Sequence, residues 1–425
     1  MHFSDFTRKS GFLFVASHVG SFVQYIFQAM MIRMLTGPEY ALMNTLLGVL
    51  GVVSSPAAVF QMDLIRRAAF AANSQDIPAI LWMAKRTLIR VMPYSVMVIL
   101  ILYFMRHSVA EFFNTSDARA IGATAAGILI VVMGAIAMGF FWGMQWFRFL
   151  GVIALVAAAL RVTLGYLLVK LGMGATGAVL ATVVCGLVPL ACFGWLMCDF
   201  RSASPSVLSE KKEEGVFWLT MMVIGTSAVL VQMDLILVKH YFPSGEAATQ
   251  FATAGIFGRA MVAFLGPLAM AIIPLSTAQT TRLGEDRNRV FWQCLKLCLA
   301  LGIIAASMGG FLANEALALM KGKELSNAEK LLLPETARLL RYYLWAMLPI
   351  ALVTVTMNHV LALRSWRLAG QAAVLTAIYP LGIVFWHGSL RVVLLVDFVF
   401  GSLILFILLW QLYRESMASQ NLMKR

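Results

Sequence analysis

Several ionisable side chains lie within long apolar stretches, where they could bind an ion or an anionic group. Asp234 and Lys239 share one such stretch, and Arg259 lies in the next. A charged side chain at membrane depth costs about 2.5–3.5 kcal/mol to insert, so it should face protein or water and find a partner. These three residues are therefore candidates for a buried polar site.

Arg259 is the strongest candidate for a ligand contact. It lies about nine residues into its predicted helix, roughly 13 Å from the helix start at 1.5 Å per residue, which is too deep for the side chain to reach the membrane surface easily. A guanidinium binds phosphate oxygens through charge-assisted, often bidentate hydrogen bonds. Arg259 is thus suited to bind an anionic group.

The other ionisable candidates each have two interpretations. Asp234 could form a structural ion pair with Lys239, which we favour, or bind a coupling proton or sodium ion. Arg33 ends the first predicted helix and could join Arg259 at a ligand or anchor the helix at the membrane surface. Arg161, in the fifth predicted helix, carries the same two interpretations.

A polar stripe runs along the first predicted helix. Ser17, Ser21, Gln24 and Gln28 are spaced four, three and four residues apart, which places them on one helical face. Such a stripe could hydrogen-bond neighbouring helices or line a cavity that binds a polar ligand. Both interpretations remain open.

The elements that carry these residues must be membrane helices. Hydrophobic residues make up 61% of the 425-residue chain and charged residues only 12%, with a mean hydropathy of +0.84. These values are outside the range of soluble globular proteins. The net charge of +13 indicates cationic cytoplasmic loops and attraction to anionic membrane lipids, and no nucleic-acid partner is expected.

Apolar runs between charge clusters predict an all-α polytopic protein with about twelve transmembrane helices. Turn sequences such as Thr36–Glu39 and Pro243–Glu246 separate the runs. The predicted helices cover residues 11–34, 41–65, 88–105, 119–141, 150–169, 174–197, 216–238, 250–275, 292–313, 337–362, 368–386 and 392–413.

A hydrophilic connection over Asp199–Gly215 divides the helices into two sets of six. We expect an N-terminal lobe over 1–207 with helices 1–6 and a C-terminal lobe over 208–425 with helices 7–12. Aligning Arg33 with Lys239 places Gln28 on Asp234, a weak internal repeat of the kind found in transporters. With both termini in the cytoplasm, the inner segments hold about 19 Lys and Arg and the outer ones about 11.

The sequence offers no set of residues for catalysis or metal binding. The five cysteines, between Cys185 and Cys298, lie within predicted helices away from His or acidic residues at metal-ligand spacing. The longest outer segment, Asn314–Glu335, contains neither a His nor an acidic cluster. We therefore expect no enzyme activity, no cofactor, no metal and no catalytic residue.

Two stretches resemble the polysaccharide and O-antigen flippase family of the multidrug/oligosaccharidyl-lipid/polysaccharide exporter superfamily. The first is the turn Thr36-Gly37-Pro38-Glu39-Tyr40, with Pro56 in the next helix and then Asp63–Arg67. The second joins Gln232–His240 to Gly258-Arg259, Gly266-Pro267 and Ile273-Pro274. Thr36 and Ala41 depart from the family's usual residues on either side of the turn. The resemblance is strongest over 10–70 and 216–282.

The resemblance implies two six-helix lobes that open alternately to each side of a bacterial cytoplasmic (inner) membrane. It also implies a lipid-linked oligosaccharide as cargo, namely a glycan on polyprenyl diphosphate used in polysaccharide or cell-envelope biosynthesis. A small-molecule or drug antiporter of the same superfamily is the main alternative, although few acids lie in the predicted helices. An integral-membrane glycan polymerase or ligase is a weaker alternative.

Overall fold

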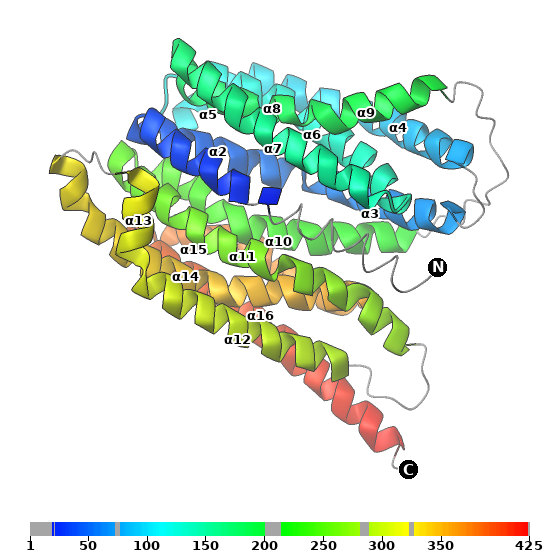
Figure 1. The fold of residues 1–425 in the computed structure, drawn as a ribbon. Helices are drawn as coiled ribbons and strands as arrows, with labels where there is room; N and C mark the ends of the chain where they lie inside the picture. Colours follow the sequence, from blue (N-terminus) through cyan, green and yellow to red (C-terminus); the bar gives the residue numbers. More distant parts are fainter. Residues whose placement is uncertain are drawn as a thin grey trace. The chain divides into compact units, whose positions relative to one another are not determined.

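The computed structural model describes residues 19–20, 22–72, 77–199, 214–280, 289–322 and 327–423 (Figure 1). Within these ranges the secondary structure is helical and contains no strand. The prediction of an all-α polytopic membrane protein is confirmed. The chain forms two compact units, Met1–Glu213 and Glu214–Arg425.

In the first unit, α6 is the central helix. It packs against α3, α4 and α8 and also against α2 and α9, because small residues along it allow close approach. A helical stretch over 22–34 precedes the labelled elements. These are α2 (Gly37–Val53), α3 (Ser55–Ala72), α4 (Ile77–Phe104), α5 (Arg106–Phe112), α6 (Ala118–Gly143), α7 (Phe147–Leu168), the π-helical segment η1 (Val169–Met173), α8 (Gly174–Cys185) and α9 (Leu187–Asp199).

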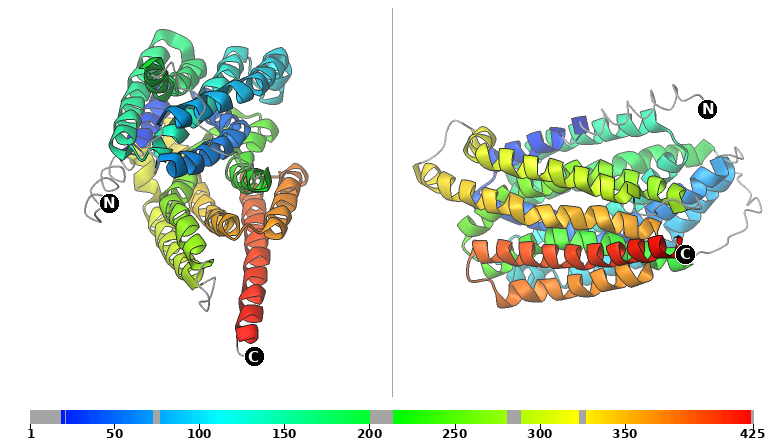
Figure 2. Two further views of the ribbon diagram at one scale, coloured as in Figure 1. Left: turned by 90° about the vertical axis from the view of Figure 1, so that its right-hand side faces the viewer. Right: turned by 90° about the horizontal axis from the view of Figure 1, so that it is seen from below.

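In the second unit, α14 holds the central position. It packs against α11, α16, α12 and α10, and Figure 2 shows the long α16 running beside α15. The elements are α10 (Glu214–Tyr241), α11 (Gly245–Thr280), α12 (Arg289–Phe311), α13 (Ala313–Lys321), α14 (Asn327–Ala362), α15 (Trp366–Phe385) and α16 (Leu390–Met423).

Nine helices in the described part of the chain are long and apolar enough to cross a membrane, and one bent helix pair would make a tenth span. One of the nine, Arg148–Cys198, is 51 residues long. That is far more than the roughly 20 residues that one crossing needs. It turns at Gly172 and Gly174, whose φ angles are +83° and +51°, and α7 packs against α8. The boundary predicted between the helices over 150–169 and 174–197 coincides with this turn.

Two helices predicted as continuous are broken. The predicted helix over 41–65 is the bent pair of α2 and α3, which meet at 47°. Pro56 lies at the start of α3 and lacks an N–H for Val52, so the regular hydrogen bonding stops there. The region predicted as one helix over 174–197 contains two helices. α8 ends at Cys185, and α9 follows with Pro189 in its first turn.

The ends of other helices differ from the prediction because a charge ends an apolar run without ending a helix. The outer segment Asn314–Glu335, expected as a connection, contains most of α13 and the start of α14. The helix predicted over 88–105 begins at Ile77, so it includes Lys85 and Arg86. Charged turns can continue a helix into water, where hydropathy gives no signal.

Candidate functional site

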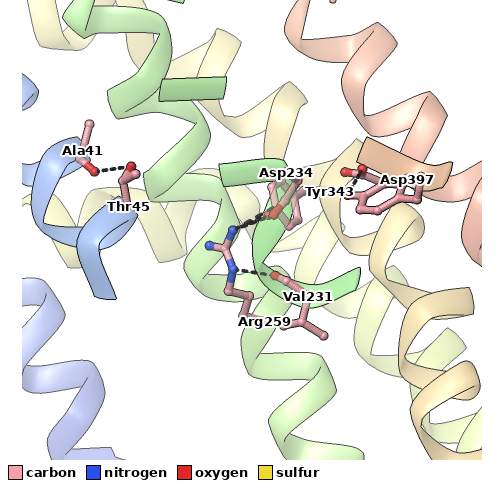
Figure 3. A network of polar contacts seen from close by, with 8 residues as sticks. Ala41, Thr45, Val231, Asp234, Arg259, Tyr343 and Asp397 are labelled. Atoms are coloured by element: carbon pink, nitrogen blue, oxygen red, sulfur yellow. Dashed lines mark hydrogen bonds and ion pairs between the residues drawn. The ribbon is translucent and has the colours of Figure 1, made fainter. Parts of the chain in front are cut away.

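The second unit contains a buried network of Asp234, Arg259 and Tyr343, contributed by α10, α11 and α14 (Figure 3). Arg259 Nη2 lies 3.2 Å from Asp234 Oδ1 and donates to the Tyr343 hydroxyl at 2.9 Å. That hydroxyl in turn donates to Asp234 Oδ2. Arg259 Nε donates to the Val231 carbonyl at 3.1 Å. The Asp234 side chain is 0% exposed and that of Arg259 16%.

Two glycines on α11 leave room for this network. A Cβ at Gly255 would lie 2.6 Å from Arg259 Nη1, and a Cβ at Gly258 would collide with the Tyr343 ring. The ring also packs edge-to-face on Phe251, with centroids 5.1 Å apart. The small residues therefore allow α11 to bring the guanidinium beside α14.

Asp397 on α16 lies next to this network. Its Oδ1 accepts a 2.7 Å hydrogen bond from the Tyr379 hydroxyl on α15, while its Oδ2 is buried without a hydrogen-bond partner among the described residues. Figure 3 shows Asp397 beyond Tyr343, on the side away from Arg259. The unit thus encloses two carboxyl groups and one guanidinium.

The first unit contains Arg161, another of the arginines predicted to lie within a membrane helix. Arg161, on α7, donates from Nη1 to Gln24 Oε1, and its guanidinium carbon lies 4.3 Å from the centre of the Phe27 ring. Its Nε is buried and has no hydrogen-bond partner among the described residues. The partners recorded for Arg161 are therefore neutral, in contrast to those of Arg259.

Gln28, from the predicted polar stripe of the first helix, holds two helices together. Gln28 donates to Asn44 at 3.2 Å and accepts from the Tyr40 hydroxyl at 3.3 Å, and its side chain is buried. These bonds join residues 22–34 to α2. Ser17 and Ser21 lie outside the described residues, so the face they were predicted to share is described only from Gln24 onward.

The other two candidate cations are Lys239, in the second unit, and Arg33, in the first. Lys239 is buried in the last turn of α10, but Asp234 pairs with Arg259 and Tyr343 rather than with Lys239. The ion pair expected for Asp234 thus exists with a different cation, and its carboxylate is fully buried. Arg33 is exposed near the end of the helical stretch over 22–34.

The turn that carries the family resemblance has a structural role. The Thr36 backbone N–H donates to Glu39 Oε2 at 2.9 Å and the Thr36 hydroxyl donates to the same oxygen at 2.8 Å. This bonding caps the start of α2, where Pro38 needs no N–H partner. Glu39 also lies against Gly174 at the α7–α8 turn, where a Cβ would collide with the carboxylate.

Sequence reasoning missed Tyr343 and Tyr379 as partners of the two buried acids. Both are fully buried and each donates a hydroxyl to a carboxylate. Tyr343 lies 109 residues from Asp234 along the chain, and Tyr379 lies on a different helix from Asp397, so neither contact follows a local sequence pattern. A usable signal was the pair Gly255 and Gly258, because small residues one turn apart beside an intramembrane Arg indicate a bulky partner.

No group of three or more His, Cys, Asp or Glu that could hold a metal ion occurs among the described residues. The five cysteines are free thiols, and Cys185 and Cys298 are buried.

Comparison with known proteins gives matches in structure alone: no family model matches the chain, and no curated protein matches it.

Solved transporter structures match nearly the whole chain. An inward-facing multidrug resistance MATE family transporter of the MOP superfamily aligns with a TM-score of 0.72 at 14% identity, covering 93% of this chain and 95% of that one. The outward-facing conformation of such a transporter gives 0.64 at 13%, with 98% and 97% covered. A MOP superfamily transporter from Pyrococcus furiosus, described as having a binding pocket of reverse polarity, gives 0.59 at 12%, with 97% and 96% covered. The chain is therefore a multi-pass membrane protein with the fold of MOP superfamily transporters.

Proposed function

We propose that this protein is a flippase that moves a polyprenyl-diphosphate-linked oligosaccharide, or a related polysaccharide precursor, across a bacterial cytoplasmic membrane. The single observation that carries the proposal is the environment of Arg161, a cation within a membrane helix whose recorded partners are the neutral side chains of Gln24 and Phe27. A guanidinium stays charged in proteins. An anionic ligand would supply the missing counter-charge.

The donors around Arg161 suit a phosphate group. Its Nε, which has no hydrogen-bond partner among the described residues, is one edge of a planar fork, and such forks bind phosphate oxygens in pairs. Gln24 keeps its amide N–H groups available when its oxygen accepts from Arg161, so it could donate to a phosphate or to a sugar hydroxyl. We assign the diphosphate contact to these two residues.

Arg259, the strongest candidate from sequence, has a different part in the proposal. Its Nη2 and Nε already bond Asp234, Tyr343 and the Val231 carbonyl. Its charge is balanced by a carboxylate, so an anion gains less from it than from Arg161. We also propose Arg33 and Lys239 as secondary contacts for the diphosphate, through their positive charge.

Transport needs no bond chemistry in this proposal. The polyprenyl tail stays in the bilayer while the polar head crosses within the protein, because burying unpaired sugar hydroxyls in hydrocarbon costs several kcal/mol each. Inward- and outward-facing structures of similar fold support an alternating-access mechanism.

Substitution of Arg161 tests the proposal. Loss of a hydrogen bond to a charged group costs about 1.5–3 kcal/mol, so Arg161→Gln should weaken the apparent affinity for the lipid-linked glycan roughly 10- to 150-fold. Arg161→Lys keeps the charge but not the fork and should lose less. Arg148→Gln is a matched control, since Arg148 is exposed at the start of the same helix. Flipping of a fluorescent lipid-linked glycan in proteoliposomes is measured, and equal rates for Arg161→Gln and Arg148→Gln would contradict the assignment.

A small-molecule or drug antiporter is the second candidate. The observations that favour it are the likeness to multidrug MATE transporters over nearly the full chain and the two buried acids, Asp234 and Asp397. An organic cation would need a carboxylate free to pair with it, whereas Asp234 is already paired with Arg259. The same proteoliposomes loaded with a cationic dye separate the two functions.

A further inference from the structure

Three exposed arginines gather at one end of the second unit, where α12 ends and α16 begins. Arg338 and Arg341 lie one turn apart on α14, and Arg391 is the second residue of α16. Arg341 Nε donates to the Gly310 carbonyl of α12 at 2.9 Å. The guanidinium carbon of Arg391 lies 5.8 Å from the centre of the Tyr342 ring on α14. These two contacts join the three helices into one basic surface.

The part of this surface that α14 contributes is short. α14 packs against both α12 and α16, and Figure 2 shows it running between them. Four exposed side chains share one face of α14, at helical spacing: Arg338, Arg341, Tyr342 and Trp345. Every residue from Ala346 to Val353 is buried. The open face of α14 therefore extends only about 10 Å from Arg338 to Trp345, at 1.5 Å per residue.

The positive charge of the surface is poorly balanced within the unit. Glu335 is exposed on α14, one turn before Arg338. No described acid forms an ion pair with any of the three arginines. The hydrogen bond of Arg341 uses Nε, which leaves the donors of its two Nη groups for a ligand. Because like charges repel, an anion among these arginines would be stabilised.

The location of the arginines is unusual for a membrane protein. These helix ends are on the side that we predict to face outward, whereas Lys and Arg are normally retained on the cytoplasmic side. Membrane insertion therefore gives no reason for three arginines here. An arginine fork binds phosphate oxygens through charge-assisted hydrogen bonds, so a phosphate ligand does give a reason.

Exposed apolar side chains continue from the arginines toward the middle of the membrane. On α16, Leu395 and Phe398 follow Arg391 at four- and three-residue spacing, so all three share one face. Their side chains are 59% and 44% exposed, and Trp345 on α14 is 43% exposed. Tryptophan is typical of the membrane interface. The surface thus offers cations and then apolar side chains, in the order in which a phospholipid presents its phosphate and its acyl chains.

We propose that this surface of α12, α14 and α16 is a binding site for an anionic phospholipid of the surrounding leaflet, with Arg338 and Arg391 holding the phosphate and Trp345 contacting an acyl chain. Arg341 donates to the phosphate from an Nη group while its Nε keeps α12 against α14. A bound lipid would hold three helix ends together and stabilise the protein by mass action. The site does not depend on the proposed cargo, whose diphosphate is assigned to Arg161 of the first unit.

Native mass spectrometry of the purified full-length protein in detergent tests the site. The wild type is titrated separately with phosphatidylglycerol and with phosphatidylcholine of the same acyl chains, and we expect tighter binding of the anionic lipid. One arginine near a membrane surface strengthens binding of anionic lipid about fivefold. Arg338→Gln and Arg391→Gln should therefore each weaken phosphatidylglycerol binding about fivefold and leave phosphatidylcholine binding unchanged.

Arg119→Gln is the matched control, because Arg119 is an exposed arginine at the start of α6 on the same predicted side of the membrane. It should bind phosphatidylglycerol as the wild type does. An equal loss in this variant would reduce the effect to general surface charge and overturn the site. Arg338 makes no hydrogen bond or ion pair with the described residues, so Arg338→Gln keeps the test decisive if Arg391→Gln does not fold.

Competition separates a phospholipid from other phosphate ligands. We expect neither inorganic diphosphate nor a lipid-linked glycan to displace phosphatidylglycerol at equal concentration. Displacement by inorganic diphosphate would replace the lipid with a soluble phosphate, and displacement by the lipid-linked glycan would make this surface a cargo contact. Either result would overturn the phospholipid assignment, as would equal affinities of the wild type for phosphatidylglycerol and phosphatidylcholine.

Discussion

Arg161 and Arg259 lie within membrane helices, but their charges are balanced in different ways. Arg259 contacts the carboxylate of Asp234, whereas Arg161 contacts an amide oxygen and an aromatic ring. A paired charge stabilises the fold only while both partners are present. A charge with neutral partners is suited to bind a ligand of opposite sign.

Breaking the Asp234–Arg259 pair should destabilise the protein strongly. Removal of one member of a buried ion pair leaves an uncompensated charge and typically costs roughly 3–5 kcal/mol. We expect Asp234→Asn and Arg259→Gln each to lower the free energy of unfolding in mixed micelles by an amount in this range. The double variant should lose clearly less than the sum, by about 1–3 kcal/mol. Additive losses would show that the two side chains do not interact.

Gly258 should be intolerant of even the smallest side chain. A Cβ there collides with the Tyr343 ring, so Gly258→Ala should lower the free energy of unfolding by about 1–3 kcal/mol. Gly225→Ala on α10 is the matched control, because its Cβ would have no heavy atom within 4 Å. That variant should be neutral or more stable by about 0.5–1 kcal/mol. Equal melting temperatures for the two variants would refute the packing argument.

At the scale of residues, the sequence indicated which charges lie in the membrane but not which ones meet. Asp234 and Arg259 were identifiable because charge is rare in apolar runs. Their partners were not, because contact between α10, α11, α14, α15 and α16 depends on how the helices pack. Pairing of Asp234 with the adjacent Lys239 was the natural choice from one helix alone, and the structure pairs it with Arg259 of the next helix instead.

At the scale of elements, hydropathy located the membrane helices and proline marked two of their breaks. The bend between α2 and α3 lies beside Pro56, and the break between α8 and α9 lies beside Pro189. Helix ends were less predictable, because α4 and α14 continue beyond their apolar stretches. Both breaks fall within helices predicted as continuous, because a missing N–H changes no hydropathy value, and helix extensions into water leave no hydropathy signal either.

The cap at the start of α2 should contribute measurably to stability. Glu39 accepts from the backbone N–H and the hydroxyl of Thr36, so Glu39→Ala should cost about 1 kcal/mol of unfolding free energy. Glu111→Ala changes an exposed acid on α5 and should stay within about 0.5 kcal/mol of the wild type. Comparable stabilities for the two variants would remove the capping role.

At the scale of the whole molecule, the distribution of cations predicts the orientation in the membrane. Because Lys and Arg are retained on the cytoplasmic side, we expect both termini and the Lys211-Lys212 connection to be inside. Green fluorescent protein fused to the C-terminus should therefore fluoresce. Alkaline phosphatase fused after Gly322, which follows α13, should be active. Inactive phosphatase there together with active phosphatase at the C-terminus would reverse the orientation.

The fold of MOP superfamily transporters extends over more than nine-tenths of the chain. The cargo is the central claim that follows from the charges within it. The most direct measurement is the flipping rate of a fluorescent polyprenyl-diphosphate oligosaccharide in proteoliposomes that contain the purified protein, with empty liposomes as the baseline and a cationic dye as the competing cargo. We predict accelerated flipping of the glycan lipid and no movement of the dye. Export of the dye without flipping of the glycan lipid would contradict the proposal and identify a drug antiporter.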